Sequence, residues 1–338
     1  LISLAGIEGL LEVEGTVNIG NNPTLKSLDG LSSIRLAQTL QVEDCDSLRS
    51  LAGLPDDLEI KKLVVGGNLT LQNLEELGDL NGLLELSIND CAELSSIAGL
   101  GSMPSLNSLF ISRCPLLASL GGLSNLDALE TFGMDWNPLI ENFTDFPSLP
   151  SVQYFSIEGN ALLESLAGLG SLPSLVRLGI FDNESLGSLE GLVSAPNLIY
   201  CTLKNNRSLT SLSGLANLPS LRDLELQDLP TLETLSDLGS FPGLVSLTIT
   251  TCGMVDFSGW AECPQLWEIF LISNPQLLSL NGIGALPSLS RLTLTDNPQL
   301  ESLAGFVELA PSYILHLESN PALVSLAGLP SDSSISLL

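Results

Sequence analysis

Few side chains in this sequence could carry catalysis, and none falls into a known catalytic spacing. Proton transfer and nucleophilic attack need groups of matched pKa that are held near one another. The chain has one histidine, His316, which the alternation of its surrounding residues places on the exposed side of a strand. No C-x-x-C, H-E-x-x-H, G-x-S-x-G or G-x-x-x-x-G-K pattern occurs. We therefore expect neither enzyme activity nor a cofactor.

One pair of acidic residues, Asp135 and Glu158, would meet on adjacent repeats and is the candidate metal site of this sequence. A dedicated calcium ladder would stack carboxylates on successive repeats and carry a glycine-aspartate motif. Acidic residues at one repeated position alternate with an amide instead, as in Asp182, Asn205 and Asp228. The favoured interpretation of the pair is therefore a solvated charged surface, and a cation site is the alternative.

All six cysteines fall at positions that the repeat turns inward. They are Cys45, Cys91, Cys114, Cys201, Cys252 and Cys263. Buried structural thiols are the favoured interpretation, because cysteine packs as a small apolar residue. Cys91 and Cys114 hold the same phase on consecutive repeats, which is close enough for a disulfide. That bridge remains an alternative.

Aromatic residues at outward strand positions are the candidate ligand-binding residues. They are Trp136, Tyr154, Phe181, Tyr200, Trp267, Phe270 and Tyr313, with Ile272 beside them. Solvent-facing aromatic side chains on a parallel sheet would stack on sugars or anchor an extended polypeptide. The alternative is that scattered exposed rings merely cover neighbouring backbone.

A short sequence repeat positions all of these side chains. Its marker residues are Asn22, Cys45, Asn68, Cys91, Cys114, Asn137, Asn160, Asn183, Asn206, Leu229, Cys252, Asn274, Asn297 and Asn320. Successive members of this ladder differ by 23 in sequence number, except for the step of 22 from Cys252 to Asn274. Near-constant spacing over almost the whole chain indicates a repeat architecture rather than a set of compact domains.

Each repeat predicts one coil of strand and turn. The L-x-L piece alternates with period two, as a half-buried strand does, and a recurring proline disfavours a helix in the return segment. Coils of this kind bury their apolar faces against their neighbours. An inward asparagine would bond backbone groups where the chain leaves the strand. The glycine of S-L-x-G-L is expected at positive φ, so the turns at Glu76, Asp145 and Asp237, which lack it, should differ locally.

The spacing L-x-x-L-x-L-x-x-N/C-x-x-L resembles that of leucine-rich repeats. The phrase NPxLxSLxGL resembles the receptor L-domain type of secreted and cell-surface bacterial proteins, over about Leu4 to Leu338. The resemblance implies a mainly β leucine-rich repeat solenoid of about 14 coils, with a parallel sheet, turns and 3-10 segments, and little or no α-helix. It also implies an extracellular or cell-surface location. We expect residues 1–338 to form one solenoid.

Composition limits the partners. Eleven basic and 39 acidic side chains give a net charge of −28, which argues against binding nucleic acid or an anionic membrane surface. No uniformly apolar run of about 18 residues occurs, so no membrane insertion is expected. The chain opens and stops inside repeats without a polar capping coil. We expect it to be part of a longer chain, or to have ends that neighbours cover.

Two functions fit these observations. The first is a non-catalytic extracellular recognition or adhesion module that presents a rigid strand face to a protein or carbohydrate ligand. The alternative is a structural protein that self-associates through its uncapped ends and stacks into a filament or surface layer.

Overall fold

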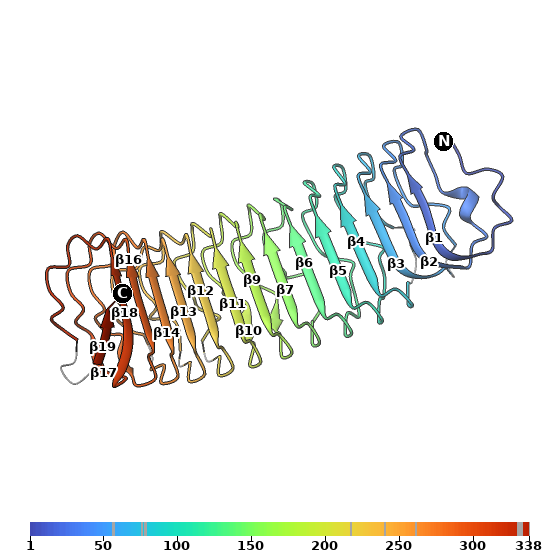
Figure 1. The fold of residues 1–338 in the computed structure, drawn as a ribbon. Helices are drawn as coiled ribbons and strands as arrows, with labels where there is room; N and C mark the ends of the chain where they lie inside the picture. The colour runs from blue at the N-terminus through green and yellow to red at the C-terminus, as the bar shows by residue number, and fades with distance from the viewer. Residues whose placement is uncertain are drawn as a thin grey trace. The chain divides into compact units, whose positions relative to one another are not determined.

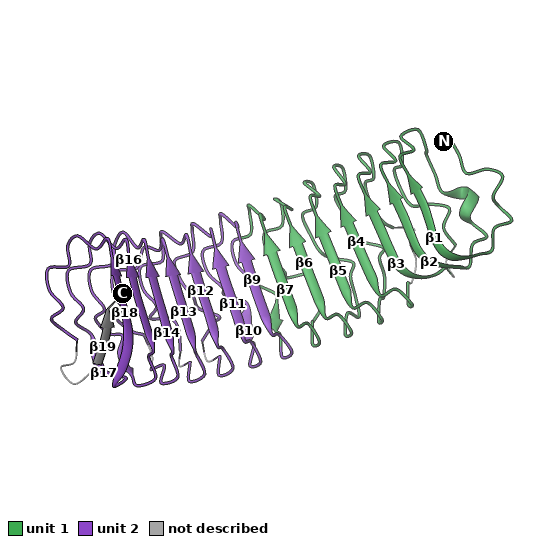
Figure 2. Cartoon of the chain, in the orientation of Figure 1, with its two compact units in different colours: residues 1–163, 167–172 green, residues 164–166, 173–338 purple. Residues whose placement is uncertain are grey.

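The computed structural model describes residues 1–55, 58–75, 77, 80–216, 218–239, 241–260, 262–329 and 334–337. They form two compact units (Figure 2): unit 1 comprises Leu1–Leu163 and Ala167–Leu172, and unit 2 comprises Glu164–Leu166 and Pro173–Leu338. Among the described residues the only helical segment is a 3-10 turn, η1 (Asp29–Leu31). The predicted β solenoid with a parallel sheet and little helix is therefore confirmed within each unit. One solenoid over the whole chain stays a prediction.

Unit 1 carries seven parallel strands that follow one another in sequence order (Figure 1). They are β1 (Glu12–Gly20), β2 (Leu36–Glu43), β3 (Glu59–Gly66), β4 (Glu85–Asn89), β5 (Ser108–Ser112), β6 (Thr131–Asp135) and β7 (Tyr154–Glu158), and the short β8 (Gly170–Ser171) lies on the return side. From β3 to β7 the paired residues are 23 positions apart. The offset between paired residues therefore equals the length of the sequence repeat.

Unit 2 repeats this arrangement with eight parallel strands (Figure 1). They are β9 (Arg177–Phe181), β11 (Tyr200–Lys204), β12 (Asp223–Gln227), β13 (Ser246–Thr250), β14 (Glu268–Ile272), β16 (Arg291–Thr295), β18 (Ser312–Glu318) and β19 (Ser334–Leu337). The short strands of the return side are β10 (Leu192–Ser194), β15 (Gly284–Leu286) and β17 (Phe306–Leu309).

The core of each unit is built from the inward residues of every coil. In β9, for example, Leu178 and Ile180 are buried while the residues on either side of them face outward. Unit 1 adds an aromatic cluster, in which the ring centroid of Phe132 lies 4.9 Å from that of Phe146 and 5.0 Å from that of Phe155. Each coil covers the next, so stability is a sum of contacts between neighbours.

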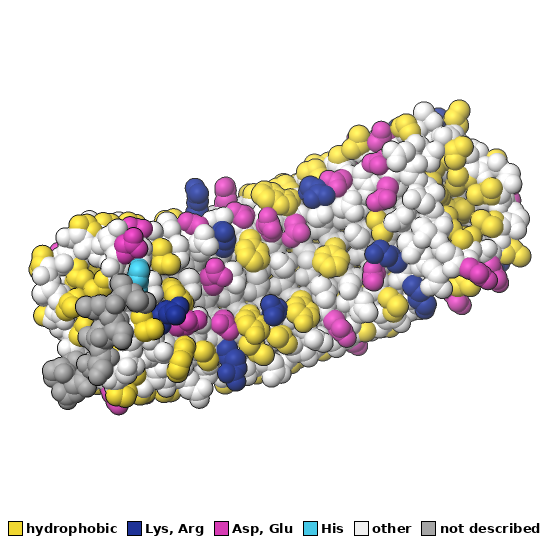
Figure 3. All heavy atoms as spheres, viewed as in Figure 1, with side chains coloured by type: hydrophobic (Ala, Val, Ile, Leu, Met, Phe, Trp, Pro, Cys, Tyr) yellow, Lys and Arg dark blue, Asp and Glu magenta, His cyan; other side chains and the backbone are white. Residues whose placement is uncertain are grey.

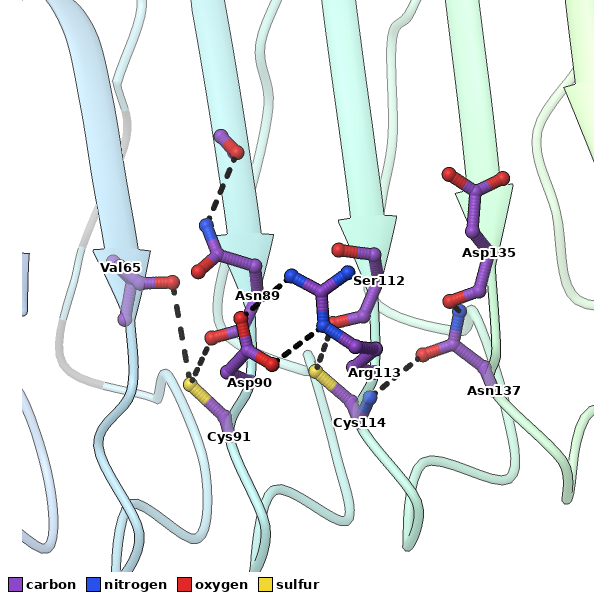
Figure 4. A network of polar contacts seen from close by, with 10 residues as sticks. Val65, Asn89, Asp90, Cys91, Ser112, Arg113, Cys114, Asp135 and Asn137 are labelled. Carbon is purple, nitrogen blue, oxygen red and sulfur yellow. Dashed lines mark hydrogen bonds and ion pairs between the residues drawn. The ribbon is translucent and has the colours of Figure 1, made fainter.

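The ladder asparagines bond the backbone of adjacent coils, as the sequence predicts. Asn137 is fully buried, and its Nδ2 donates to the carbonyl oxygens of Ile111 (2.9 Å) and Asp135 (3.0 Å). Its Oδ1 accepts from the backbone N–H of Cys114 at 3.1 Å (Figure 4). A cysteine on the ladder supplies only the donor, as Cys45 does through Sγ. Asparagine therefore satisfies both kinds of backbone group, and cysteine only one.

Replacing Asn137 with leucine should lower the free energy of unfolding by about 2–4 kcal/mol, because it leaves buried backbone donors and acceptors without partners. Asn137→Cys should cost less, since a thiol still donates to the carbonyl groups. Thermal unfolding followed by circular dichroism measures both variants. Melting temperatures equal to that of the unmodified chain in both variants would show that the hydrogen bonds of the ladder amide contribute no net stability.

The glycine of the S-L-x-G-L turn adopts positive φ, as predicted, at positions such as Gly53, Gly122 and Gly214. Asp145 and Asp237 replace this glycine, and neither has a positive φ. Asp145 Oδ2 instead accepts a hydrogen bond from Ser119 Oγ at 2.9 Å, and Asp237 accepts from Ser211 in the same way. The predicted local difference is confirmed at these two turns. The third, at Glu76, lies outside the described residues.

Close approach between turns gives these glycines a second role. A Cβ on Gly122 would lie 2.5 Å from the Cα of Ala98 on the preceding coil, whereas a Cβ on Gly170 would have no heavy atom within 4 Å. Both glycines have positive φ, 107° and 72°. The φ of Gly170 lies close to the left-handed region that other residues can adopt, whereas that of Gly122 lies well outside it, so a side chain at Gly122 meets a larger conformational cost as well as a steric one.

We expect Gly170→Ala to cost about 1–2 kcal/mol through its left-handed backbone alone, and Gly122→Ala to cost clearly more. Melting temperatures of the two variants, compared with that of the unmodified chain, measure the difference. If both shifts are equal, contact between neighbouring turns does not limit the residue at this position.

Candidate functional site

The strand face of unit 1 carries a group of exposed aromatic and acidic side chains on β5, β6 and β7. The exposed fractions are 44% for Phe110, 50% for Trp136 and 45% for Tyr154. Asp135 ends β6 and Glu158 ends β7, and these two residues are paired in register. We call these five residues the aromatic–acidic patch. In Figure 3, acidic side chains lie beside apolar ones over the ends of these strands.

Two of the three rings rest on glycines of the next coil. A Cβ on Gly133 would lie 2.7 Å from Cδ1 of Phe110, and a Cβ on Gly159 would lie 2.5 Å from Cδ2 and Cε3 of Trp136. Only a residue without a side chain leaves room for a ring at these places. The inner side of each ring is therefore held by backbone, while about half of the side-chain surface stays open to solvent.

Trp136 directly follows strand β6, at a position where the backbone of each coil is left-handed. The residue just before each ladder position has φ between 52° and 67°, and the full set is Asn21, Asp44, Gly67, Asp90, Arg113, Trp136, Gly159, Asp182, Asn205, Asp228, Thr251, Ser273, Asp296 and Ser319. Asn, Asp and Gly tolerate this conformation, and bulky residues rarely adopt it. Trp136 is the one aromatic side chain in this set, and a bulky residue is unfavourable in this conformation.

The acidic members of the patch, Asp135 and Glu158, lie next to each other on adjacent strands. Among the described residues, no basic side chain forms an ion pair with Asp135 or Glu158. The nearby Arg113 is engaged with Asp90, through Nε to Oδ1 (2.5 Å) and Nη2 to Oδ2 (2.7 Å) (Figure 4). Partial burial raises the pKa of Asp135, and repulsion from Glu158 adds to it, while Arg113 opposes the rise.

Neutralising Asp135 should stabilise the protein at neutral pH. Because the folded-state pKa of Asp135 is raised, the folded chain holds this proton more tightly than the unfolded chain, and stability is lost as pH rises through the folded pKa. Asp135→Asn should therefore raise the melting temperature at pH 7 and give no gain near pH 3, below the ordinary Asp pKa of about 3.9. An equal gain at both pH values would show that the amide acts through packing or hydrogen bonding.

The predicted aromatic residues of unit 2 are more scattered. Tyr200 is exposed and lies under the guanidinium of Arg177, whose Cζ is 4.4 Å from the ring centroid. Trp267 is 53% exposed and lines an open groove of about 580 Å³ with Val245 and Pro287. Phe181 and Phe270 lie at partly exposed outward positions of β9 and β14, as does Ile272.

The prediction that Tyr313 faces outward is wrong, because this side chain is only 2% exposed. The residues P-S-Y313 correspond to P-S-L289 of the preceding coil, but one residue fewer separates Tyr313 from the strand. Strand β18 therefore pairs Ile314, not Tyr313, with Arg291. Tyr313 lies buried at the start of this strand, and it is not a candidate binding residue.

Phe110 is the patch residue that the sequence reasoning missed. It lies at the centre of S-L-F-I-S, where alternation with the buried Leu109 and Ile111 turns it outward. The same period-two rule that selected Tyr154 could have selected it.

The remaining groups that could carry chemistry are the cysteines, the histidine and the other carboxylates. No cluster of three or more His, Cys, Asp or Glu suited to a metal occurs among the described residues. All six cysteines are buried thiols, so Cys91 and Cys114 are not bridged. Burial raises the pKa of Cys201 and Cys252 to about 12, which keeps these thiols protonated. His316 Nε2 lies 3.3 Å from Oε2 of Glu318 at the surface.

Parallel strands stacked in register, closed by an asparagine or cysteine ladder, decide the architecture. The chain has the fold of a leucine-rich repeat solenoid. No protein-family model and no curated protein matches the chain. In the described residues, no helix is long and apolar enough to cross a membrane.

Several solved leucine-rich repeat structures are similar to this chain. TLR13 in complex with ssRNA13 is 16% identical over 88% of this chain (TM-score 0.37), and the match spans 62% of that chain, less than two thirds of its length. YopM from Yersinia enterocolitica WA-314 is 22% identical over 93% of this chain and 82% of its own (TM-score 0.37). A leucine-rich repeat protein from Bacteroides ovatus ATCC 8483 is 13% identical over 96% of this chain and 88% of its own (TM-score 0.26).

Proposed function

We propose that this chain is a non-catalytic recognition module, which presents the aromatic–acidic patch of unit 1 to a protein or glycan at the cell surface or outside the cell. The extracellular setting follows from the sequence resemblance to receptor L-domain repeats. Stacking end to end into a filament, and the absence of nucleic-acid partners, stay predictions of the sequence.

The observation that carries the proposal is the half-exposed ring of Trp136 on Gly159, with Phe110 on Gly133 one coil earlier. Rings that only covered backbone would gain nothing from an open outer side, and apolar area left in water costs roughly 25 cal/mol per Å². Aromatic side chains held in place lose little entropy on binding, which is why they dominate binding energy at interfaces. The patch therefore has the properties of a binding surface.

Array binding tests this function. The purified chain is applied to a peptide array and a glycan array, beside the triple variant Phe110→Ala, Trp136→Ala and Tyr154→Ala. We expect the variant to lose the strongest signals by on the order of tenfold or more, since anchor residues cost at least about 2 kcal/mol when truncated.

The matched control removes three aromatic side chains from unit 2: Tyr200→Ala, Trp267→Ala and Phe270→Ala. This variant should bind as the unmodified chain does. Circular dichroism confirms that both triple variants are folded. If the unit 1 variant keeps all of the binding, the patch is not the recognition surface.

A further inference from the structure

We infer that the aromatic–acidic patch takes a cationic side chain, the ammonium or guanidinium group of a basic polypeptide, against Trp136 and between Asp135 and Glu158. This inference rests on the proposed function and names the ligand class of the same surface.

Charge is the first reason. Asp135 and Glu158 are paired across β6 and β7, and no described basic side chain forms an ion pair with either. Arg113, one ladder position away, has its guanidinium bonded to both carboxylate oxygens of Asp90. Two partly buried carboxylates that repel each other gain from a cation supplied by a ligand. The net charge of −28 adds long-range attraction for such a partner.

The indole is the second reason, because tryptophan is the best aromatic partner for a cation. Trp136 follows Asp135 in the chain, and its ring rests on Gly159, which follows Glu158. The backbone N–H of Trp136 donates to the carbonyl oxygen of Glu158 at 2.7 Å, which fixes the two coils at this point. Asp135 and Glu158 therefore both lie next to the indole: one precedes the tryptophan itself, and the other precedes the glycine under its ring.

The shape of the surface favours a polypeptide over a single ion. Two carboxylates make an incomplete site for calcium, which takes 6–8 oxygen ligands, and no cluster of three ligands lies among the residues described. Phe110 pairs with Gly133 and Tyr154 pairs with Thr131, so the patch continues from Trp136 along the strand direction towards the start of β7. Apolar side chains of an extended polypeptide would pack on these two rings, away from the cation.

A neutral sugar would also stack on the rings, but it would leave the negative charge of Asp135 and Glu158 uncompensated. Neutral glycans and a bare metal ion are therefore the alternatives that the experiment separates.

Tryptophan fluorescence gives a direct readout. In the variant Trp267→Phe, Trp136 is the only half-exposed tryptophan, because Trp260 is 9% exposed. A short peptide of alternating lysine and glycine is titrated into this variant, and the same peptide with Nε-acetylated lysines serves as the neutral probe. We expect a saturable change with the lysine peptide alone, which weakens as salt rises.

The charge contribution is measured with the double variant Asp135→Asn and Glu158→Gln, which keeps shape and removes both charges. Affinity for the lysine peptide should fall about tenfold. The control Asp296→Asn and Glu301→Gln removes two exposed charges from unit 2 and should change affinity by about twofold or less. Trp136→Ala, followed by calorimetry, should weaken binding roughly fivefold to thirtyfold.

Different failures have different meanings. If acetylated and unmodified peptides bind alike, or if the double variant binds the lysine peptide unchanged, the cationic ligand is ruled out, while loss on Trp136→Ala would keep the recognition function. If calcium chloride alone gives a saturable change that needs both carboxylates but not Trp136, the site is a metal site and the inference is overturned. If no peptide or neutral glycan shows binding that depends on Trp136, the proposed function fails as well.

Discussion

Burial of each coil's leucine face against its neighbours is the constraint on which this protein depends. A single coil is too short to enclose a core, so its apolar side chains become dry only where another coil covers them. Parallel register at a spacing equal to the repeat length keeps leucine over leucine, as in Leu86 and Leu109, and ladder asparagine over ladder asparagine, as in Asn137 and Asn160. The ladder amides then satisfy backbone groups that no strand partner reaches, such as the N–H of Cys114.

The same constraint decides where function can reside. Inward positions and turn glycines are committed to packing, so on the strand face the outward strand positions and the left-handed residue after each strand are free to vary. Most coils fill the left-handed place with Asn, Asp or Gly, which suit its backbone conformation. One coil has Trp136 at this place, and the next coil has Gly159 at the equivalent position, beneath the ring. A substitution against local preference, matched by a glycine at the same position of the next coil, is the clearest departure from the repeat in unit 1.

The surrounding charges distinguish Trp136 from Tyr200, an exposed aromatic residue of unit 2. Tyr200 in unit 2 already has a cation, the guanidinium of Arg177, over its ring. Near Trp136, no basic side chain among the described residues forms an ion pair with Asp135 or Glu158, and Arg113 is bonded to Asp90. An aromatic ring that already has a cation over it has little left for a ligand cation, whereas carboxylates without an ion-pair partner attract one. In the binding mode that we propose, the charge environment sets the ligand preference of unit 1 more than the number of rings does.

The sequence by itself determined the coil, its inward ladder and its turn glycines, because the alternation within each strand and the longer period along the chain are both visible in the order of residues. It also placed Asp135 beside Glu158 and turned Tyr154 outward. Tertiary structure alone decided that Phe110 and Trp136 rest on Gly133 and Gly159. It also buried Tyr313, through a one-residue change in the spacing between turn and strand. Local alternation fixes the side of a strand on which a residue lies. The atoms that it touches belong to another coil, and only stacking in register brings them together.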